Sequence, residues 1–374
     1  MPKRTPTQLD IPRLRLANQH LISPTATDPV EVVRRLGAVQ SQDYAGGKWG
    51  VGMRTNGLTD ADVERALNAG SIVRTHVLRP TWHFLAAPDA RWILALTAPR
   101  VQIANANPYR NTELTPAILR KSEKIITKAL SGGNHLTRAE LGKILARAGI
   151  DVSNLQRLSY VMMNAELNAL IISGPRRGNQ FTYALFDERV PETKPLERDE
   201  ALAELARRYF ATRGPATVHD FAWWSGLTIA DSRKAIALLE SALVSEQVGE
   251  KTYWMAYDAG PPAVGRNLVH LLPNYDEYFI GFRDRSAMAD VVKEFSLLPG
   301  DPMFASHILV HDGQFIGGWK RAIKPKAVSV DILLLSKLTV AARKALLATA
   351  KQYGTFLGLP IEVSGHTDER GRAG

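Results

Sequence analysis

Residues 213–257 have the sequence RGPATVHDFAWWSGLTIADSRKAIALLESALVSEQVGEKTYWMAY, and they are the clearest guide to the architecture. Gly226 ends a short apolar helix, and Thr228 caps a second helix whose apolar residues recur at helical spacing. After them, apolar and polar residues alternate on both sides of a Gly-containing turn, as in a two-stranded hairpin. The expected helices cover residues 219–225 and 229–241, and the expected strands cover residues 243–247 and 252–257. Two helices followed by a hairpin predict a winged helix-turn-helix module.

Two further stretches repeat this plan. In residues 137–185, Thr137 and Glu140 form a capping-box pattern before the first of two helices, and two strands follow. Residues 11–98 contain additional helices and then two β-rich runs, 71–78 and 81–86. The sequence therefore predicts three tandem winged helix-turn-helix modules.

Pro-containing, charged linkers are expected near residues 112–116, 191–195 and 260–262. They divide the chain into a first winged helix with extra helices (1–112), a second (113–195), a third (196–262) and a C-terminal β-rich domain (263–374). An amphipathic helix is expected over residues 340–357 of the last domain. The predicted fold class is α+β, with three tandem winged helix-turn-helix modules followed by a β-rich domain that carries a terminal helix.

The composition is that of a globular protein. The chain has 374 residues, of which 45% are hydrophobic and 22% are charged, and it contains no cysteine. These values exclude a disordered or collagen-like chain, disulfides, catalytic thiolates and Cys-ligated zinc. No apolar run approaches the roughly 18 residues of a membrane span, and the N-terminal MPKRTPTQLD lacks the apolar core of a signal peptide. We therefore expect a soluble, cytoplasmic monomer without membrane contact, metal or other cofactor.

Positive charge is concentrated near the N-terminus. The formal net charge is +10, and residues 1–130 carry 18 Lys and Arg against 10 Asp and Glu, which is +8. Such asymmetry suggests a polyanionic partner. Together with three winged helices it favours a protein that binds duplex DNA, although winged helices also serve as protein–protein scaffolds.

The search for catalytic motifs leaves one candidate. No Gly-rich phosphate loop, His-Glu-x-x-His or Gly-x-Ser-x-Gly motif occurs, but Gln40 and Gln42 flank Ser41 in the segment VQSQDY. In extended backbone the two glutamines would project to one side, whereas in a helical turn they would diverge by about 160°. Paired glutamines offer donors and acceptors but cannot take a proton at neutral pH. From spacing alone, a polar helix end is the competing interpretation.

Two other polar clusters could in principle carry a functional site. Asp276-Glu277 follows an expected strand and is either a functional pair or a polar turn with aromatic residues packed beneath it. His307 and His311 lie on one expected strand about 13 Å apart, which disfavours a shared metal ion.

The chain resembles the winged-helix DNA glycosylases of the AlkZ/YcaQ type over roughly residues 10–360. The segments that carry the resemblance are 36–42 (LGAVQSQ), 74–83 (RTHVLRPTWH), 214–217 (GPAT), 221–227 (FAWWSGL) and 313–320 (GQFIGGWK). The first is similar to the family's Gln-apolar-Gln catalytic motif, with Ser41 at the usually apolar position. In the second, Pro80 and Trp82 replace the family's usual Gly and Leu.

The resemblance implies an enzyme in which Gln40 and Gln42 are catalytic. The expected reaction is monofunctional hydrolysis of the N-glycosidic bond of cationic alkylated purines, including bulky or crosslinking adducts. The glutamines would position the attacking water. The alternative is a non-catalytic winged-helix DNA-binding protein, either a regulator or an architectural protein.

The expected partner is duplex DNA. The candidate DNA-binding residues are Arg74, Arg79, His83, Arg54, Lys48, Arg176 and Arg177. Arg79 could meet phosphate or the minor groove, and His83 could bond a phosphate or the water, although it could equally be a core residue beside Trp82. Arg176 and Arg177 occupy the Gly-rich tip of the second expected hairpin, where arginines are often only solvated.

Overall fold

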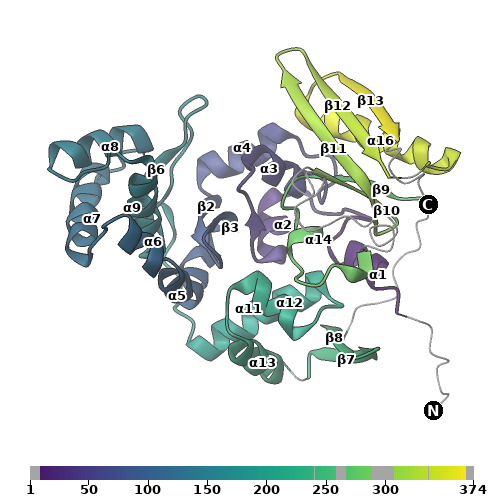
Figure 1. Cartoon of the computed structure of the whole chain (residues 1–374), viewed down its shortest axis with the longest axis horizontal. Coiled ribbons are helices and arrows are strands. Elements are labelled where there is room, and N and C mark those ends of the chain that lie inside the picture. The colour runs from purple at the N-terminus through teal and green to yellow at the C-terminus, as the bar shows by residue number, and fades with distance from the viewer. Residues whose placement is uncertain (1–8, 240, 258–266, 289–306, 336, 368–374) are drawn as a thin grey trace.

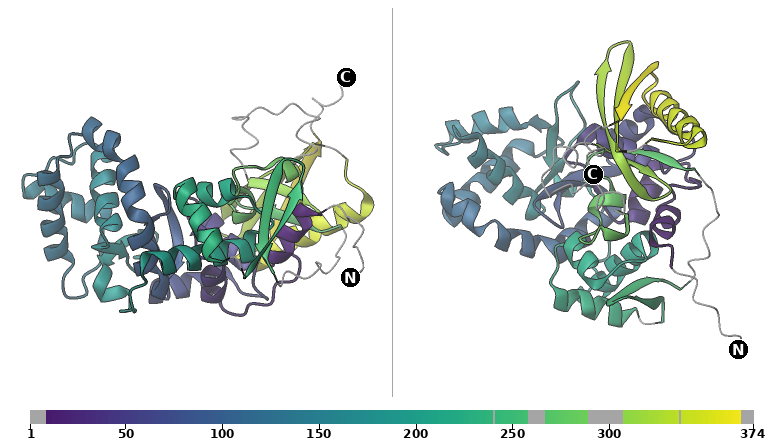
Figure 2. Two further views of the ribbon diagram at one scale, coloured as in Figure 1. Left: turned by 90° about the horizontal axis from the view of Figure 1, so that it is seen from below. Right: turned by 45° about the vertical axis from the view of Figure 1, so that its right-hand side comes forward.

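The computed structural model describes residues 9–239, 241–257, 267–288, 307–335 and 337–367, and it shows a mixed α+β protein (Figure 1). Residues 106–190 lie at one end of the molecule and the C-terminal sheet lies at the other, with the N-terminal elements between them (Figure 2). Within the described ranges, no helix is both long enough and apolar enough to cross a membrane.

The N-terminal part surrounds a small antiparallel sheet with strand order β1-β3-β2. Its elements are α1 (Ile11–Asn18), α2 (Pro29–Leu36), β1 (Val39–Gln40), α3 (Tyr44–Gly52), α4 (Asp60–Ala69), β2 (Ile72–Val77), β3 (Thr81–Ala86) and α5 (Ala87–Ala104). The expected strands over 71–78 and 81–86 are confirmed as β2 and β3. A capping box between Thr59 and Asp62 starts α4, and Gly70 ends it with φ of 84°.

The next part packs helices against a sheet with strand order β4-β6-β5. Its elements are α6 (Ala106–Asn111), α7 (Pro116–Leu130), β4 (Leu136–Thr137), α8 (Arg138–Arg147), α9 (Leu155–Leu167), β5 (Ile171–Ser173), β6 (Thr182–Leu185) and α10 (Phe186–Arg189). The sequence analysis missed α7, which begins inside the expected 112–116 linker. Thr115 caps this helix and Pro116 occupies its first position, where proline fits without losing a hydrogen bond.

The third part begins with a long helix that the sequence analysis also missed. Its elements are α11 (Arg198–Arg213), α12 (Val218–Ser225), α13 (Ile229–Leu238), β7 (Leu243–Val248) and β8 (Lys251–Ala256). Thr217 forms a capping box with Asp220 at the start of α12, and Gly226 ends α12 in the left-handed conformation. The expected linker at residues 260–262 lies outside the described residues.

The C-terminal part is a sheet of strand order β13-β12-β11-β10-β9 with one long helix. Its elements are β9 (Val269–Leu272), α14 (Glu277–Ile280), a 3₁₀ turn (Ser286–Met288), β10 (His307–His311), β11 (Gln314–Lys324), β12 (Ala327–Leu334), α16 (Val340–Leu357) and β13 (Ile361–Thr367). The helix over 340–357 is confirmed, but it is not the terminal element. Strand β13 follows it and pairs in parallel with β12, because a crossover helix returns the chain to the same edge of the sheet.

Two apolar cores hold these parts together. The smaller contains residues between Leu114 and Tyr183, whereas the larger joins the N-terminal part, α11–α13 and the C-terminal sheet. Within the larger core, the indole N–H of Trp49 in α3 donates to the carbonyl of Leu271 in β9 over 2.7 Å. This bond ties α3 of the N-terminal part to β9 of the C-terminal sheet.

Candidate active site around Gln40 and Gln42

The segment Gln40–Asp43 connects the end of β1 to the start of α3. Gln40 lies opposite His83 in the sheet, and the amide of Ser41 donates to the carbonyl of Trp82 over 2.8 Å. Asp43 caps α3, because its carboxylate accepts from the amide of Gly46 at 3.0 Å. The segment thus leaves the sheet and enters a helix within three residues.

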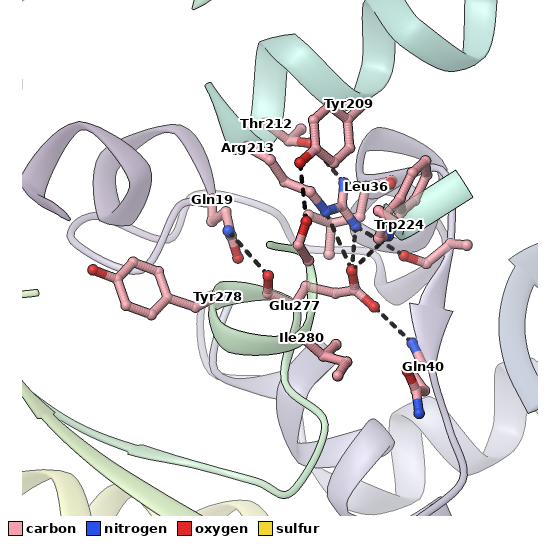
Figure 3. Close-up of polar contacts among 12 residues, drawn as sticks. Gln19, Leu36, Gln40, Tyr209, Thr212, Arg213, Trp224, Glu277, Tyr278 and Ile280 are labelled. Atoms are coloured by element: carbon pink, nitrogen blue, oxygen red, sulfur yellow. Dashed lines mark hydrogen bonds and ion pairs between the residues drawn. The ribbon is translucent and has the colours of Figure 1, made fainter. Parts of the chain in front are cut away.

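A buried carboxylate from the C-terminal part holds the backbone of Gln40. The amide of Gln40 donates to Oε1 of Glu277 over 2.8 Å (Figure 3). The other oxygen, Oε2, accepts from Nη2 of Arg213 at 2.6 Å and from the indole of Trp224 at 2.9 Å. Glu277 and Arg213 are both 0% exposed, so α11, α12 and α14 meet β1 in a dry interior.

Arg79 fixes the side chain of Gln40, which is 5% exposed. Nη2 of Arg79 donates to Oε1 of Gln40 over 2.8 Å, while Nη1 of Arg79 donates to the carbonyls of Trp223 and Trp224 at 3.2 and 3.3 Å. Since arginine only donates, this bond turns the amide oxygen of Gln40 toward Arg79 and its NH₂ group away.

Arg74 holds the segment at Ser41. Its guanidinium donates to the Ser41 carbonyl at 3.0 and 3.3 Å and lies 4.4 Å from the ring centre of Trp82. Phe181, from the neighbouring part of the chain, also contacts this guanidinium, at 4.9 Å. The aromatic faces stabilise the cation by cation–π attraction without neutralising it.

Arg74 and Arg79 differ from Arg54 and Arg213 in having no ion-pair partner in the described part of the chain. Within the described residues, neither has a carboxylate within 4.0 Å, and their hydrogen bonds go to neutral oxygens. Burial lowers the pKa of both groups, but arginine stays charged at neutral pH. Two guanidinium groups to which no described carboxylate bonds directly therefore flank the glutamine segment.

Gln42 and Asp43 differ from Gln40 in their surroundings. Gln42 is exposed, and its Oε1 receives only a long 3.4 Å contact from the amide of Trp82. Asp43 forms a two-bond ion pair with Arg321 of β11 at 2.7 and 2.8 Å. Its carboxylate is thus engaged both by the helix it caps and by an arginine.

His83 is a core residue of the sheet. It is 0% exposed, and its Nδ1 lies 2.9 Å from the carbonyl of Thr81, which assigns the proton to Nδ1. Burial, with a further contribution from the Arg79 charge, lowers the pKa of His83 well below its usual value. The ring is therefore neutral at neutral pH, and it lies too deep to touch a phosphate, contrary to its prediction as a DNA contact.

Arg54 and Lys48 are also unsuited to the predicted DNA contact. Arg54 is 1% exposed and forms a two-bond ion pair with Asp276 at 2.8 and 2.9 Å. The buried ammonium of Lys48 lies between Asp60 and Glu64 at 2.8 and 2.7 Å. Both charges are neutralised inside the protein, so neither side chain is available to bind a DNA phosphate.

The two arginines of the expected hairpin tip lie in different environments. Arg176 contacts the rings of Tyr44 and Phe181 and lies 3.7 Å from Glu64. Arg177 is half exposed and pairs with Glu140 at 2.7 Å. Arg177 lies at the surface as expected, but it already has an acidic partner.

Sequence reasoning missed the residues that hold the segment in place. Glu277 was noted only as one half of a polar pair, and Arg213, Trp224 and Arg321 were not assigned roles. Apolar flanks around two adjacent acidic residues were the available signal, because a carboxylate buried among aromatics needs a cationic partner. No group of three or more His, Asp and Glu that could hold a metal occurs among the described residues.

Most of the chain matches a class of DNA-repair enzymes. The family of AlkZ-like DNA glycosylases matches residues 33–356, and the chain belongs to that family. It is therefore a DNA glycosylase, a hydrolase of N-glycosyl bonds.

A sequence relative and a solved structure, both from Streptomyces sahachiroi, are similar to this chain. An interstrand DNA cross-link repair glycosylase of Streptomyces sahachiroi is 26% identical over 321 residues, covering 82% of this chain and 85% of that protein. The solved structure of Streptomyces sahachiroi DNA glycosylase AlkZ has a TM-score of 0.77 at 24% identity. The match covers 95% of this chain and 98% of the AlkZ chain, so the two proteins share a fold along almost their whole lengths.

Proposed function

We propose that the protein excises cationic alkylated purines from duplex DNA, including bulky or crosslinking adducts, with Gln40 and Gln42 positioning the attacking water. The observation that carries this proposal is the make-up of the segment. Gln40 is held between Glu277 and Arg79, Gln42 is exposed beside it, and the carboxylate within residues 40–43, that of Asp43, is paired with Arg321. The similarity to a cross-link repair glycosylase supports the same substrate class.

The chemistry suits an amide pair. An N7-alkylated purine already carries a positive charge, so it leaves without being protonated, and the transition state resembles an oxocarbenium ion. The enzyme then has to orient water and stabilise charge rather than remove a proton early. Glutamine can do this, whereas a neutral base would require a free acid or base.

The ion pairs of Lys48 support a monofunctional reaction. The Lys48 ammonium is bound to Asp60 and Glu64, so it is not a free amine that could form a Schiff base with the sugar. The expected products are a free base and an abasic site in an unbroken strand.

DNA binding would use the arrangement predicted from sequence, three winged helix-turn-helix modules in tandem. The helix pairs α8–α9 and α12–α13, each followed by a two-stranded hairpin, support this assignment. Among the predicted contacts, Arg74 and Arg79 are the strongest candidates for binding phosphate, because both lie beside the glutamine segment and their hydrogen bonds go to neutral oxygens.

The test is to incubate the protein with a duplex carrying one N7-methylguanine and to analyse base and strand separately. We expect free N7-methylguanine, a strand that breaks only after alkali treatment, and no adduct trapped by borohydride. Duplex binding without base release would instead identify a non-catalytic DNA-binding protein. A borohydride-trapped adduct would overturn the monofunctional mechanism.

A further inference from the structure

We propose that Glu277 is a positioning residue for base excision, because its carboxylate fixes the backbone from which Gln40 projects; this inference rests on the proposed function. Glu277 lies 237 residues beyond Gln40 in the chain, at the start of α14. Its contribution is to hold the segment and not to touch DNA, since its side chain is 0% exposed.

The carboxylate is surrounded by donors. Oε1 accepts from the amide of Gln40, and Oε2 accepts from Arg213, through both Nε at 3.2 Å and Nη2 at 2.6 Å, and from Trp224. A neutral amide at this position would turn its NH₂ group either toward the Gln40 amide or toward Arg213 and Trp224. Either orientation places donor against donor, so only a carboxylate satisfies the whole set.

Arg213 extends the same hold to the residues that precede Gln40. Its Nη1 donates to the carbonyl of Leu36 at 2.8 Å, and its Nη2 donates to the carbonyl of Ala38 at 3.1 Å. The chain entering β1 is therefore tied at two carbonyls by Arg213 and at the Gln40 amide by Glu277 (Figure 3). Arg79 then fixes the side chain.

The consequence is that Glu277 and Gln40 act together although they belong to different parts of the fold. Catalytic groups lose much of their effect when they are displaced by about 1 Å, with rates falling on the order of 10²-fold. Losing the Glu277 bond should therefore slow base release while leaving the exposed DNA-binding surface intact.

The chain offers a matched control. Asp89 of α5 is also a buried carboxylate. It pairs at 2.6 and 2.9 Å with Arg208, which lies on α11 as Arg213 does, and it accepts from the indole of Trp92 at 3.0 Å. Among the described residues, neither Asp89 nor Arg208 bonds to residues 40–43. Asp89→Asn thus reproduces the loss of a buried ion pair without touching the glutamine segment.

The experiment compares the parent protein with Glu277→Gln and Asp89→Asn in single-turnover base release, duplex affinity and hydrogen exchange of residues 36–44. Both variants should unfold at lower temperature. Only Glu277→Gln should release base about 10- to 100-fold more slowly at unchanged affinity and exchange faster at residues 36–44. Should Glu277→Gln fail to fold, Glu277→Asp, which keeps the charge but shortens its reach, carries the same expectation.

Two results would overturn the inference: parental release and exchange in the Glu277 variant, or an equal slowing of release in Asp89→Asn. The exchange measurement also separates this inference from the proposed function. If the parent releases no base, the proposed function fails, yet faster exchange confined to the Glu277 variant still supports the positioning role. Unchanged exchange in that variant rejects it.

Discussion

Gln40 and Gln42 stand two residues apart but occupy different environments. Gln40 is buried and held through both its backbone and its side chain, whereas Gln42 is exposed and has one long hydrogen bond. The amide oxygen of Gln40 already accepts from Arg79, so the Gln42 amide is the less constrained of the two and is better placed to bind a water molecule. The two residues thus divide into a fixed member and an adaptable one.

Replacing either glutamine with alanine should reduce chemistry more than binding. A dipole directed at the attacking water acts mainly in the transition state, so the loss should fall on the rate of base release at saturating DNA. By analogy with an oxyanion donor, we expect a decrease of about 10²–10³-fold, with duplex affinity nearly unchanged. Parental rates in both Gln40→Ala and Gln42→Ala would show that the catalytic assignment is wrong.

The burial of His83 predicts a dependence of stability on pH. Its pKa is lowered in the folded protein, so the unfolded chain binds a proton first, near pH 6.5. The stabilisation is therefore present above pH 6.5 and is lost as the pH falls toward the folded pKa. Urea unfolding should show that His83→Asn loses less stability between pH 7 and pH 5 than the parent does. Equal losses would mean that folding does not lower the pKa of His83.

At the scale of elements, the hairpin of β2 and β3 carries two arginines that lie beside the glutamine segment and have no carboxylate within 4.0 Å among the described residues. Arg74 lies within β2, and Arg79 lies in the turn, where it also bonds Gln40. Local sequence was enough to predict this hairpin, because alternation and the Arg79-Pro80 turn are local signals. The α16 boundaries were predictable for the same reason.

The long-range partners of the glutamine segment and of α3 were not predictable from one sequence. Glu277 reaches Gln40, Asp276 reaches Arg54 and Arg321 reaches Asp43 across more than 200 residues of chain, and no local spacing encodes such pairs. For the same reason, sequence alone predicts Arg54 and Lys48 as DNA contacts, although carboxylates inside the protein neutralise both. A positive residue near a motif indicates binding only when its counter-ion is known.

Neutralisation of phosphates by the hairpin arginines gives a measurable prediction. Arg74→Ala and Arg79→Ala should each weaken duplex binding equally across sequences, and each should flatten the slope of log K against log salt by about one unit. Arg177→Ala serves as the control, because Arg177 is already paired with Glu140 and should change the slope less. A larger effect from Arg177 would place the phosphate contact on the other hairpin.

At the scale of the whole molecule, the positive charge is concentrated in one part of the chain, whereas the larger core is shared by several parts. Most of the +10 net charge lies in residues 1–130, whereas the larger core joins the N-terminal part, α11–α13 and the C-terminal sheet. The glutamine segment lies in the basic region and is held by residues of the other two parts. We therefore expect the site to require the whole chain and not its first part alone.

The same charge distribution predicts duplex binding with little sequence preference and a steep salt dependence. Each phosphate neutralised should add about −0.9 to the slope of log K against log salt. Titrations of two unrelated duplexes at several salt concentrations measure this directly. A flat slope would favour a protein-interaction role for the helical modules.

The central claim is that an amide pair without a free base removes bases that are already cationic. The most direct measurement quantifies the free base released in single turnovers from two duplexes that differ at one position, one with N7-methylguanine and one with uracil, a neutral base. We predict release of N7-methylguanine, loss of that release in the Gln40→Ala, Gln42→Ala double variant, and no release of uracil. Release of uracil at a comparable rate, or undiminished release of N7-methylguanine by the double variant, would contradict the account.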